Sequence, residues 1–74
     1  MLSIYQDEKR RKYLTEHYKG GFAIVTYDYY GDRIRREACV GSRTRVQKIL
    51  DDRADSEGWK WIGKQGGTSI VCQK

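Results

Sequence analysis

Proline is absent from this sequence, and histidine, methionine and cysteine are rare. The 74 residues include one histidine, one methionine and two cysteines, and the apolar run at residues 22–25 is far too short to span a bilayer. Two cysteines and one histidine are too few for a four-ligand zinc site. His17 is the only histidine, and no serine or cysteine nucleophile lies near a base in the sequence. Membrane-spanning, zinc-binding and triad-hydrolase classes are therefore disfavoured.

No enzyme or cofactor motif stands out either. The glycines at residues 63–67 lack the order of a phosphate-binding loop and the helix that must follow it. The carboxylates at residues 51–57 have the spacing of a solvated helix face. We therefore expect a non-enzymatic protein with no cofactor and no metal.

The N-terminal residues contain no apolar core of a secretory signal. This predicts a cytoplasmic protein in which Cys39 and Cys72 are reduced. We expect residues 1–74 to form one small domain, because a chain of this length has only a small core. Such a domain gains support from a partner, which makes a homodimer an open alternative.

Positive charge and aromatic side chains are plentiful. Fifteen Lys and Arg face ten Asp and Glu, which gives a net charge of +5. The isoelectric point is about 9.4, and the mean hydropathy is −0.86. Two Trp, six Tyr and one Phe supply material for a core, so a disordered tail is disfavoured. The charge favours a polyanionic or acidic partner.

The spacing of apolar and turn residues predicts an α+β domain in the order α-ββ-α-ββ. A four-stranded antiparallel sheet built from two hairpins would carry both helices on one face. The acid-first pairs Asp7–Arg11 and Glu8–Lys12 favour the first helix, and Thr44 or Ser42 begins the second. The predicted elements are a helix at 5–19, a hairpin at 22–40, a helix at 43–57 and a hairpin at 59–73.

The first predicted hairpin turns at Gly31-Asp32, which sets its register. Tyr30 would face Arg33, and on the other side of the sheet Val25 would face Ala38. The face with Ala23, Val25 and Tyr27 is expected to be the core face. Trp59 and Trp61 of the second hairpin are also expected in the core.

The basic residues concentrate between Arg33 and Lys48, where six positive residues accompany only Glu37. We expect Arg33 and Arg35 to reach base edges or groove walls and the later residues to hold phosphates. The predicted binding residues are Tyr30, Arg33, Arg35, Arg36, Arg43, Arg45 and Lys48, with Lys60 and Lys64 as secondary members. The alternative is that these arginines only protect a sheet edge. The run at residues 9–12 is interpreted as a solvated helix face.

The leading functional hypothesis is a small basic module that binds DNA or RNA mainly through phosphates. The alternative is an inhibitor or adaptor of the type that phages and mobile elements encode. It would block a host nucleic-acid-processing protein such as a nuclease or polymerase. Its motivation is the small size, the lack of catalytic groups and the tyrosines, which favour interfaces.

Two short stretches resemble known families. The order of a helix, Gly58-Trp59, a strand and a glycine turn resembles HicA-type mRNA-cleaving toxins, but Thr68 stands where those carry the catalytic histidine. Ribonuclease activity is therefore not implied. A basic strand-turn-strand and helix at residues 27–50 is similar to the arm-type DNA-binding domain of phage-like integrases, which implies DNA binding.

Overall fold

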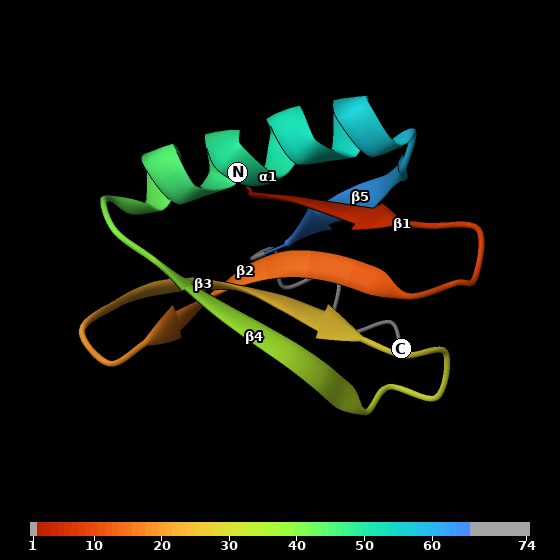
Figure 1. Cartoon of the computed structure of the whole chain (residues 1–74), viewed down its shortest axis with the longest axis horizontal. Helices are drawn as coiled ribbons and strands as arrows, with labels where there is room; N and C mark the ends of the chain where they lie inside the picture. The colour runs from red at the N-terminus through yellow and green to blue at the C-terminus, as the bar shows by residue number, and fades with distance from the viewer. Residues whose placement is uncertain (1, 66–74) are drawn as a thin grey trace.

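The computed structural model describes residues 2–65 as a five-stranded antiparallel sheet with one helix across one face (Figure 1). The strand order is β4-β3-β2-β1-β5, so β1 lies inside the sheet and β4 and β5 form its edges. The elements are β1 (Leu2–Gln6), β2 (Lys12–Tyr18), β3 (Gly21–Tyr27), β4 (Arg33–Cys39), α1 (Arg43–Glu57) and β5 (Lys60–Gln65). The α+β class is confirmed, but its elements differ from those predicted.

The predicted helix at 5–19 is wrong, because this segment forms β1, a turn and β2. The carboxylate of Asp7 closes the turn: its Oδ1 accepts hydrogen bonds from the backbone N–H of Lys9 and of Arg11, both at 2.9 Å. Arg11 Nε donates to Asp7 Oδ2 at 2.7 Å. The acid-base pair four residues apart therefore exists, but it stabilises a turn. Aspartate favours this local geometry as readily as a helix surface.

The same turn recurs between β3 and β4. Asp28 Oδ1 accepts from the backbone N–H of Tyr30 and of Asp32, both at 2.9 Å. The fourth residue has positive φ in both turns, 66° for Arg10 and 91° for Gly31. The loop is therefore residues 28–32 rather than Gly31-Asp32 alone.

The prediction of a hairpin at this place is confirmed, but the longer loop changes the register between β3 and β4. Ala23 lies opposite Ala38, and Thr26 lies opposite Arg35. The predicted pairing was displaced by two residues. Away from the turn, a displacement of two keeps each side chain on its predicted side of the sheet. The pairing is irregular between Thr26 and Tyr27, however, so Arg33 lies opposite Tyr27 and on the other side of the sheet from Arg35, and the prediction that these two arginines share a face is wrong.

The helix, however, covers the face opposite to the one predicted as the core. The core cluster consists of Tyr13, Ile24, Val46 and Leu50, with Tyr5, Phe22, Cys39, Ile49 and Trp59 packed against it. Ala23 and Val25 point to the other side and are still buried, with 0% and 1% of their surface exposed. Since β3 is apolar on both faces, its pattern alone could not identify which face meets the helix.

The helix at 43–57 is confirmed as α1. Ser42 is its N-cap and accepts from the backbone N–H of Arg45 at 3.2 Å, whereas Gly58 ends it with φ of 77°. Val46, Leu50 and Ala54 are buried, as the spacing indicates. No helix within residues 2–65 is long and apolar enough to cross a membrane.

The predicted second hairpin is described only in its first strand. β5 pairs with β1, and Tyr5 lies opposite Trp61. Trp59 stacks on Tyr13 with ring centroids 3.7 Å apart, but Trp61 is 52% exposed, so its assignment to the core is wrong. The turn at 66–67, the returning strand and Cys72 lie outside the described residues.

The β2–β3 loop offers a direct test of the hairpin geometry. Tyr18 lies opposite Gly21, which leaves a two-residue loop in which Lys19 and Gly20 both have positive φ, 47° and 78°. Asn-Gly is the preferred pair for such a loop. We expect Lys19→Asn to raise the free energy of unfolding in urea by about 0.5–1 kcal/mol, because the left-handed region costs other non-glycine residues more.

Gly20→Ala is the matched control and should lower the free energy of unfolding by about 1 kcal/mol, since Gly20 has space around it and only its φ is restrictive. A destabilising Lys19→Asn substitution would contradict the loop geometry.

Candidate nucleic-acid interface

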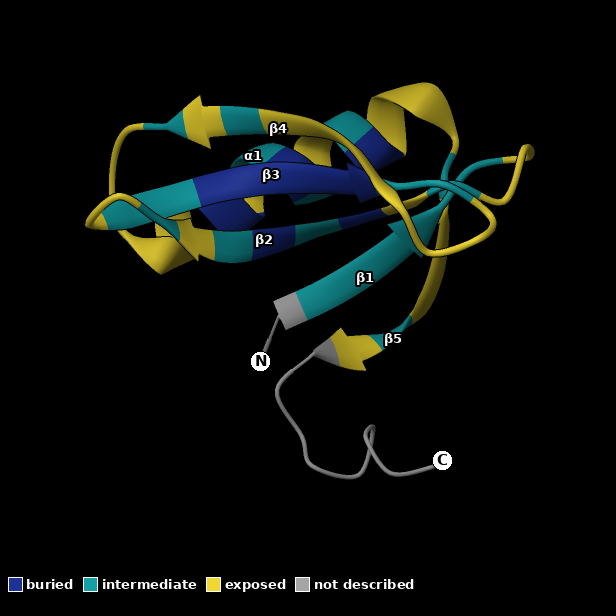
Figure 2. Cartoon of the chain, turned by 90° about the horizontal axis from the view of Figure 1, so that it is seen from below, coloured by how far each residue is buried: buried dark blue, intermediate teal, exposed yellow. Residues whose placement is uncertain are grey.

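The sheet has an open face, defined here as the side opposite α1. Figure 2 looks onto this side, with α1 behind the strands. Side chains alternate between the two faces of each strand, so the pairing registers identify which residues lie together there. No helix of the described chain covers this face.

A row of mostly basic side chains crosses the whole open face. Tyr27 is opposite Arg33 on one side and Lys12 on the other, and Gln6 is opposite both Lys12 and Lys60. We call these five residues the cross-strand row. Its three cations are exposed and occur on alternate strands, which places them about 10 Å apart. Strand pairing thus gathers residues that are far apart in the sequence.

Polar side chains close over the apolar centre of the open face. The hydroxyl of Tyr27 donates to Glu16, and this hydrogen bond, followed by burial, raises the pKa of Tyr27. The guanidinium of Arg36 lies 4.5 Å from the ring centre of Tyr18. Val25 lies directly opposite Arg36 in the sheet, which accounts for its burial on a side that no helix covers. Arg36 therefore has a packing role as well as its charge.

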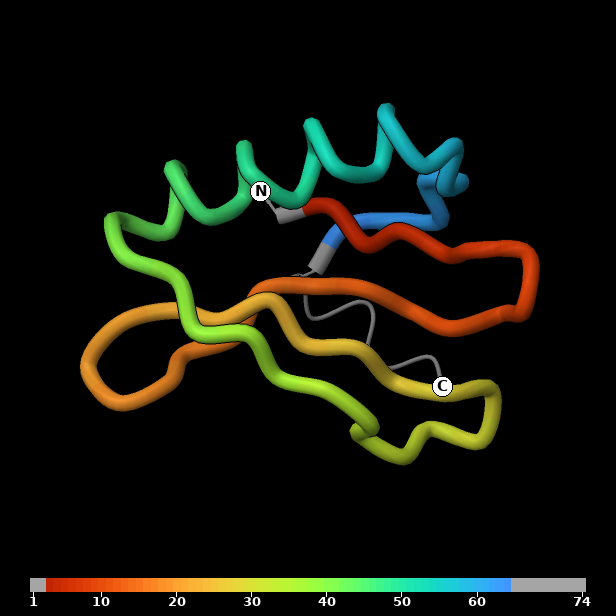
Figure 3. Tube along the Cα trace, viewed as in Figure 1, coloured from red at the N-terminus to blue at the C-terminus, as the bar shows by residue number. Residues whose placement is uncertain are grey.

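The two aspartate turns lie at the same end of the sheet, here called the turn end and defined as residues 7–11 and 28–32 (Figure 3). The guanidinium of Arg10 is 5.4 Å from the ring centre of Tyr29, so the turns touch. The rings of Tyr29 and Tyr30 pack edge to face with their centres 5.2 Å apart. Tyr29 is 59% exposed and Tyr30 is 83% exposed. The turn end therefore combines cations with accessible aromatic rings.

The structure does not bring the predicted binding residues into one site. Tyr30 lies at the turn end and Arg33 directly follows it, whereas Arg43 contacts His17 at 3.3 Å and lies 5.5 Å from the ring centre of Phe22. Those contacts are at the opposite end of the sheet, where α1 begins (Figure 3). The rest of β4, which begins at Arg33, separates the two groups.

The helix members of the predicted set lie on a surface with no net charge. The helix α1 carries four cations and four carboxylates: Arg43, Arg45, Lys48 and Arg53, with Asp51, Asp52, Asp55 and Glu57. Lys48 Nζ lies 3.8 Å from Asp52. The helix therefore contributes no net positive charge, and its basic residues lie away from the open face.

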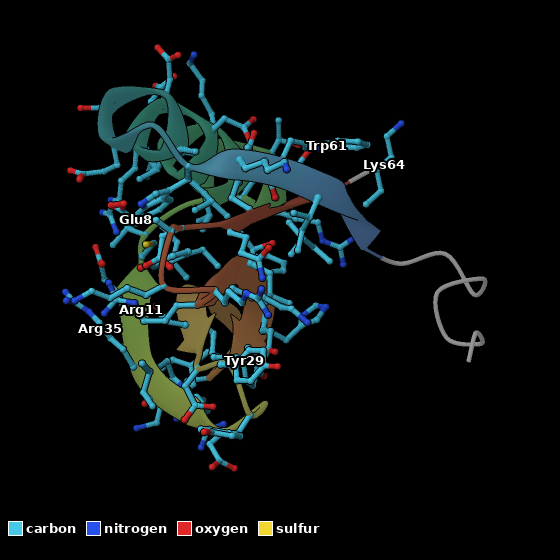
Figure 4. All side chains as sticks on the ribbon, turned by 90° about the vertical axis from the view of Figure 1, so that its right-hand side faces the viewer. Glu8, Arg11, Tyr29, Arg35, Trp61 and Lys64 are labelled. Carbon is cyan, nitrogen blue, oxygen red and sulfur yellow. The ribbon has the colours of Figure 1, made fainter. Side chains whose placement is uncertain are left out.

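Arg35 points to the helix side, where it borders a groove of about 300 Å³. Arg53 makes two hydrogen bonds to Glu37, at 2.8 and 2.9 Å, and Arg35 approaches the same carboxylate at 3.6 Å. The Arg53 hydrogen bonds hold the pKa of Glu37 below its ordinary value. Figure 4 shows Arg11 and Arg35 reaching toward the same side, where Trp59 also lines the groove.

The secondary residues separate in the same way. Lys60 belongs to the cross-strand row, but Lys64 lies beyond a register shift in the β1–β5 pairing and pairs with Ser3. Figure 4 places Lys64 beside Trp61 at the outer edge of β5. Only Lys60 therefore joins the basic residues of the open face.

Lys9, Arg10 and Lys12 of the candidate interface were not predicted from the sequence, because residues 9–12 were interpreted as a solvated helix face. The available signal was the aspartate that opens each turn: Asp7 precedes this basic run as Asp28 precedes the tyrosines. An aspartate followed by four residues before a strand is consistent with such a turn.

Comparison with protein-family models, with curated proteins and with solved structures finds no match to this chain. The two family resemblances in the sequence therefore gain no support. Within residues 2–65, no group of three or more His, Cys, Asp or Glu side chains could hold a metal ion.

The Glu37–Arg53 pair predicts a pH-dependent contribution to stability. The pKa of Glu37 is lowered from 4.5 on folding, so its contribution is complete above pH 4.5 and is lost as the pH falls through the lower folded value. Both side chains are about one-third exposed, so we expect Glu37→Gln to cost about 0.5–1 kcal/mol at pH 7. Urea unfolding at pH 7 and at pH 2 measures the difference.

Asp55→Asn provides the control, since Asp55 is an exposed carboxylate on the same helix and has no ion pair within the described residues. A Glu37→Gln effect that persists unchanged at pH 2 would contradict the electrostatic explanation.

Proposed function

We propose that this protein binds nucleic acid, with phosphate contacts on the open face and at the turn end. The observation that carries the proposal is the cross-strand row, in which Arg33, Lys12 and Lys60 line up across the sheet. Phosphate contacts provide most of the affinity of sequence-independent nucleic-acid binding. A line of exposed cations at regular spacing suits a phosphate backbone.

The distribution of acidic residues strengthens this argument. Outside α1, residues 2–65 contain ten Lys or Arg and six Asp or Glu. Four of those six carboxylates are engaged internally: Asp7 and Asp28 in turns, Glu16 with Tyr27 and Glu37 with Arg53. In contrast, Lys9, Lys12 and Lys60 form no ion pair within the described part of the chain. Positive potential is therefore left free to attract a polyanion.

The proposed interface revises the set expected from the sequence. It retains Tyr30, Arg33 and Lys60 and adds Lys9, Arg10, Lys12 and Tyr29. Arg36 flanks it on the open face. Arg43, Arg45 and Lys48 are omitted because they belong to the balanced surface of α1.

A protein partner is the second candidate, supported by a different surface. Trp61 is 52% and Ile62 39% exposed, and both lie on the edge strand β5. Exposed aromatic and aliphatic side chains at a strand edge favour a protein interface. This supports the inhibitor or adaptor hypothesis without involving the cross-strand row.

Two charge-matched double variants test the proposal by fluorescence anisotropy with labelled oligonucleotides across a salt series. Lys12→Ala/Arg33→Ala should lower affinity at least tenfold and reduce the slope of log K against log salt by about 1.4–1.8, because two phosphate contacts are lost. Arg45→Ala/Lys48→Ala removes the same charge from α1 and should leave affinity within about twofold.

Equal losses in the two variants would show that only net charge matters and would contradict the assigned interface. No binding of any oligonucleotide at low salt would overturn the proposal and favour the protein partner, because low salt is where a basic surface binds polyanions best.

A further inference from the structure

Resting on the proposed function, we infer that the nucleic acid bound here is single-stranded, with unpaired bases on Tyr29 and Tyr30 and its backbone along the cross-strand row. The inference comes from the shape of the basic surface and from the exposure of those two rings. Each point distinguishes an unpaired strand from a duplex.

The sheet does not offer an element that fits the major groove of a duplex. A two-stranded ribbon can enter that groove, which is about 12 Å wide. Although β3 and β4 form a hairpin, β3 is also paired along its length with β2, so the hairpin is no free ribbon. Five strands span about 19 Å between the outer two. The helix, the other element that could enter the groove, has a balanced charge.

The tyrosines at the turn end suit unpaired bases. Tyr30 is 83% exposed and Tyr29 is 59% exposed, far more than a packing role would require. Their edge-on contact and the Arg10 guanidinium beside Tyr29 hold the rings in a defined arrangement. Aromatic rings stack on bases that are not already paired and stacked within a duplex.

The cross-strand row then defines the path of the nucleic-acid backbone over the sheet and the number of nucleotides that this path can hold. It starts at Arg33, the residue directly after the second turn, and crosses to Lys60 on the far edge. The rise of a strand within a duplex is about 3.4 Å per nucleotide and an unstacked strand extends further, so the roughly 19 Å between the outer strands accommodates at most about six nucleotides. The affinity should therefore rise with oligonucleotide length and level off by about six to eight nucleotides.

The experiment compares labelled eight-nucleotide DNA and RNA strands with the corresponding eight-base-pair duplexes, at one salt concentration. We expect the single strands to bind at least tenfold more tightly. Tyr29→Ala/Tyr30→Ala should weaken single-strand binding about tenfold and change duplex binding less than twofold. Tyr29→Phe/Tyr30→Phe keeps both rings and should stay within about twofold of the parent.

Each outcome separates this inference from the proposed function. If strand and duplex bind with equal affinity and Lys12→Ala/Arg33→Ala still weakens binding, the inference is overturned and the proposed function stands. A Phe variant that binds as weakly as the Ala variant would also overturn it, because the hydroxyls rather than the stacking rings would then be required. Absence of binding to every oligonucleotide would remove the proposed function itself.

Discussion

The hydrogen bonds that the Asp7 carboxylate accepts are the interactions on which the rest of the structure depends. One oxygen accepts two backbone N–H groups of the first turn, and the other accepts the hydroxyl of Tyr13 at 2.8 Å. Tyr13 in turn stacks on Trp59, the residue that leads into β5. Burial, together with the Asp7 hydrogen bond, raises the pKa of Tyr13 to about 12. One side chain thus fixes the β1–β2 hairpin and connects it to the core. Because β5 pairs with β1, the outer strand depends on the same hairpin.

The two aspartate turns explain why one hairpin could be predicted from the sequence and the other could not. In the second turn the position of positive φ is occupied by Gly31, and this glycine made the turn recognisable in the sequence. In the first turn the same position is occupied by Arg10. Without a glycine, the two acidic residues followed by four basic ones at residues 7–12 also fit the i,i+4 charge pairing of a helix. The clear stripe of Val46 and Leu50 identified α1 because a helix is encoded by its own residues. A turn that uses a costly backbone conformation gives a weaker local signal.

The candidate interface was harder to predict because it depends on pairing between distant strands. Arg33 and Lys48 are close in the sequence, yet β4 carries the chain from the turn end to the start of α1 and separates them. Lys12 and Arg33 are distant in the sequence, yet both lie opposite Tyr27. Net charge could be counted from the composition. Its placement required the strand order, which in turn required β1 to be recognised as a strand.

The position of Lys12 also distinguishes the two explanations for the basic residues. Arginines on β4 would keep this edge strand from pairing with another copy, because like charges would meet, so Arg33 alone is consistent with edge protection. Lys12 lies on β2, an interior strand, at a position that pairs with Gln6 of β1 on one side and with Tyr27 of β3 on the other. Protection of an edge gives no reason for an exposed cation there. The continuity of Arg33, Lys12 and Lys60 across interior and edge strands alike therefore supports the proposed extended anionic ligand over the protection of edges alone.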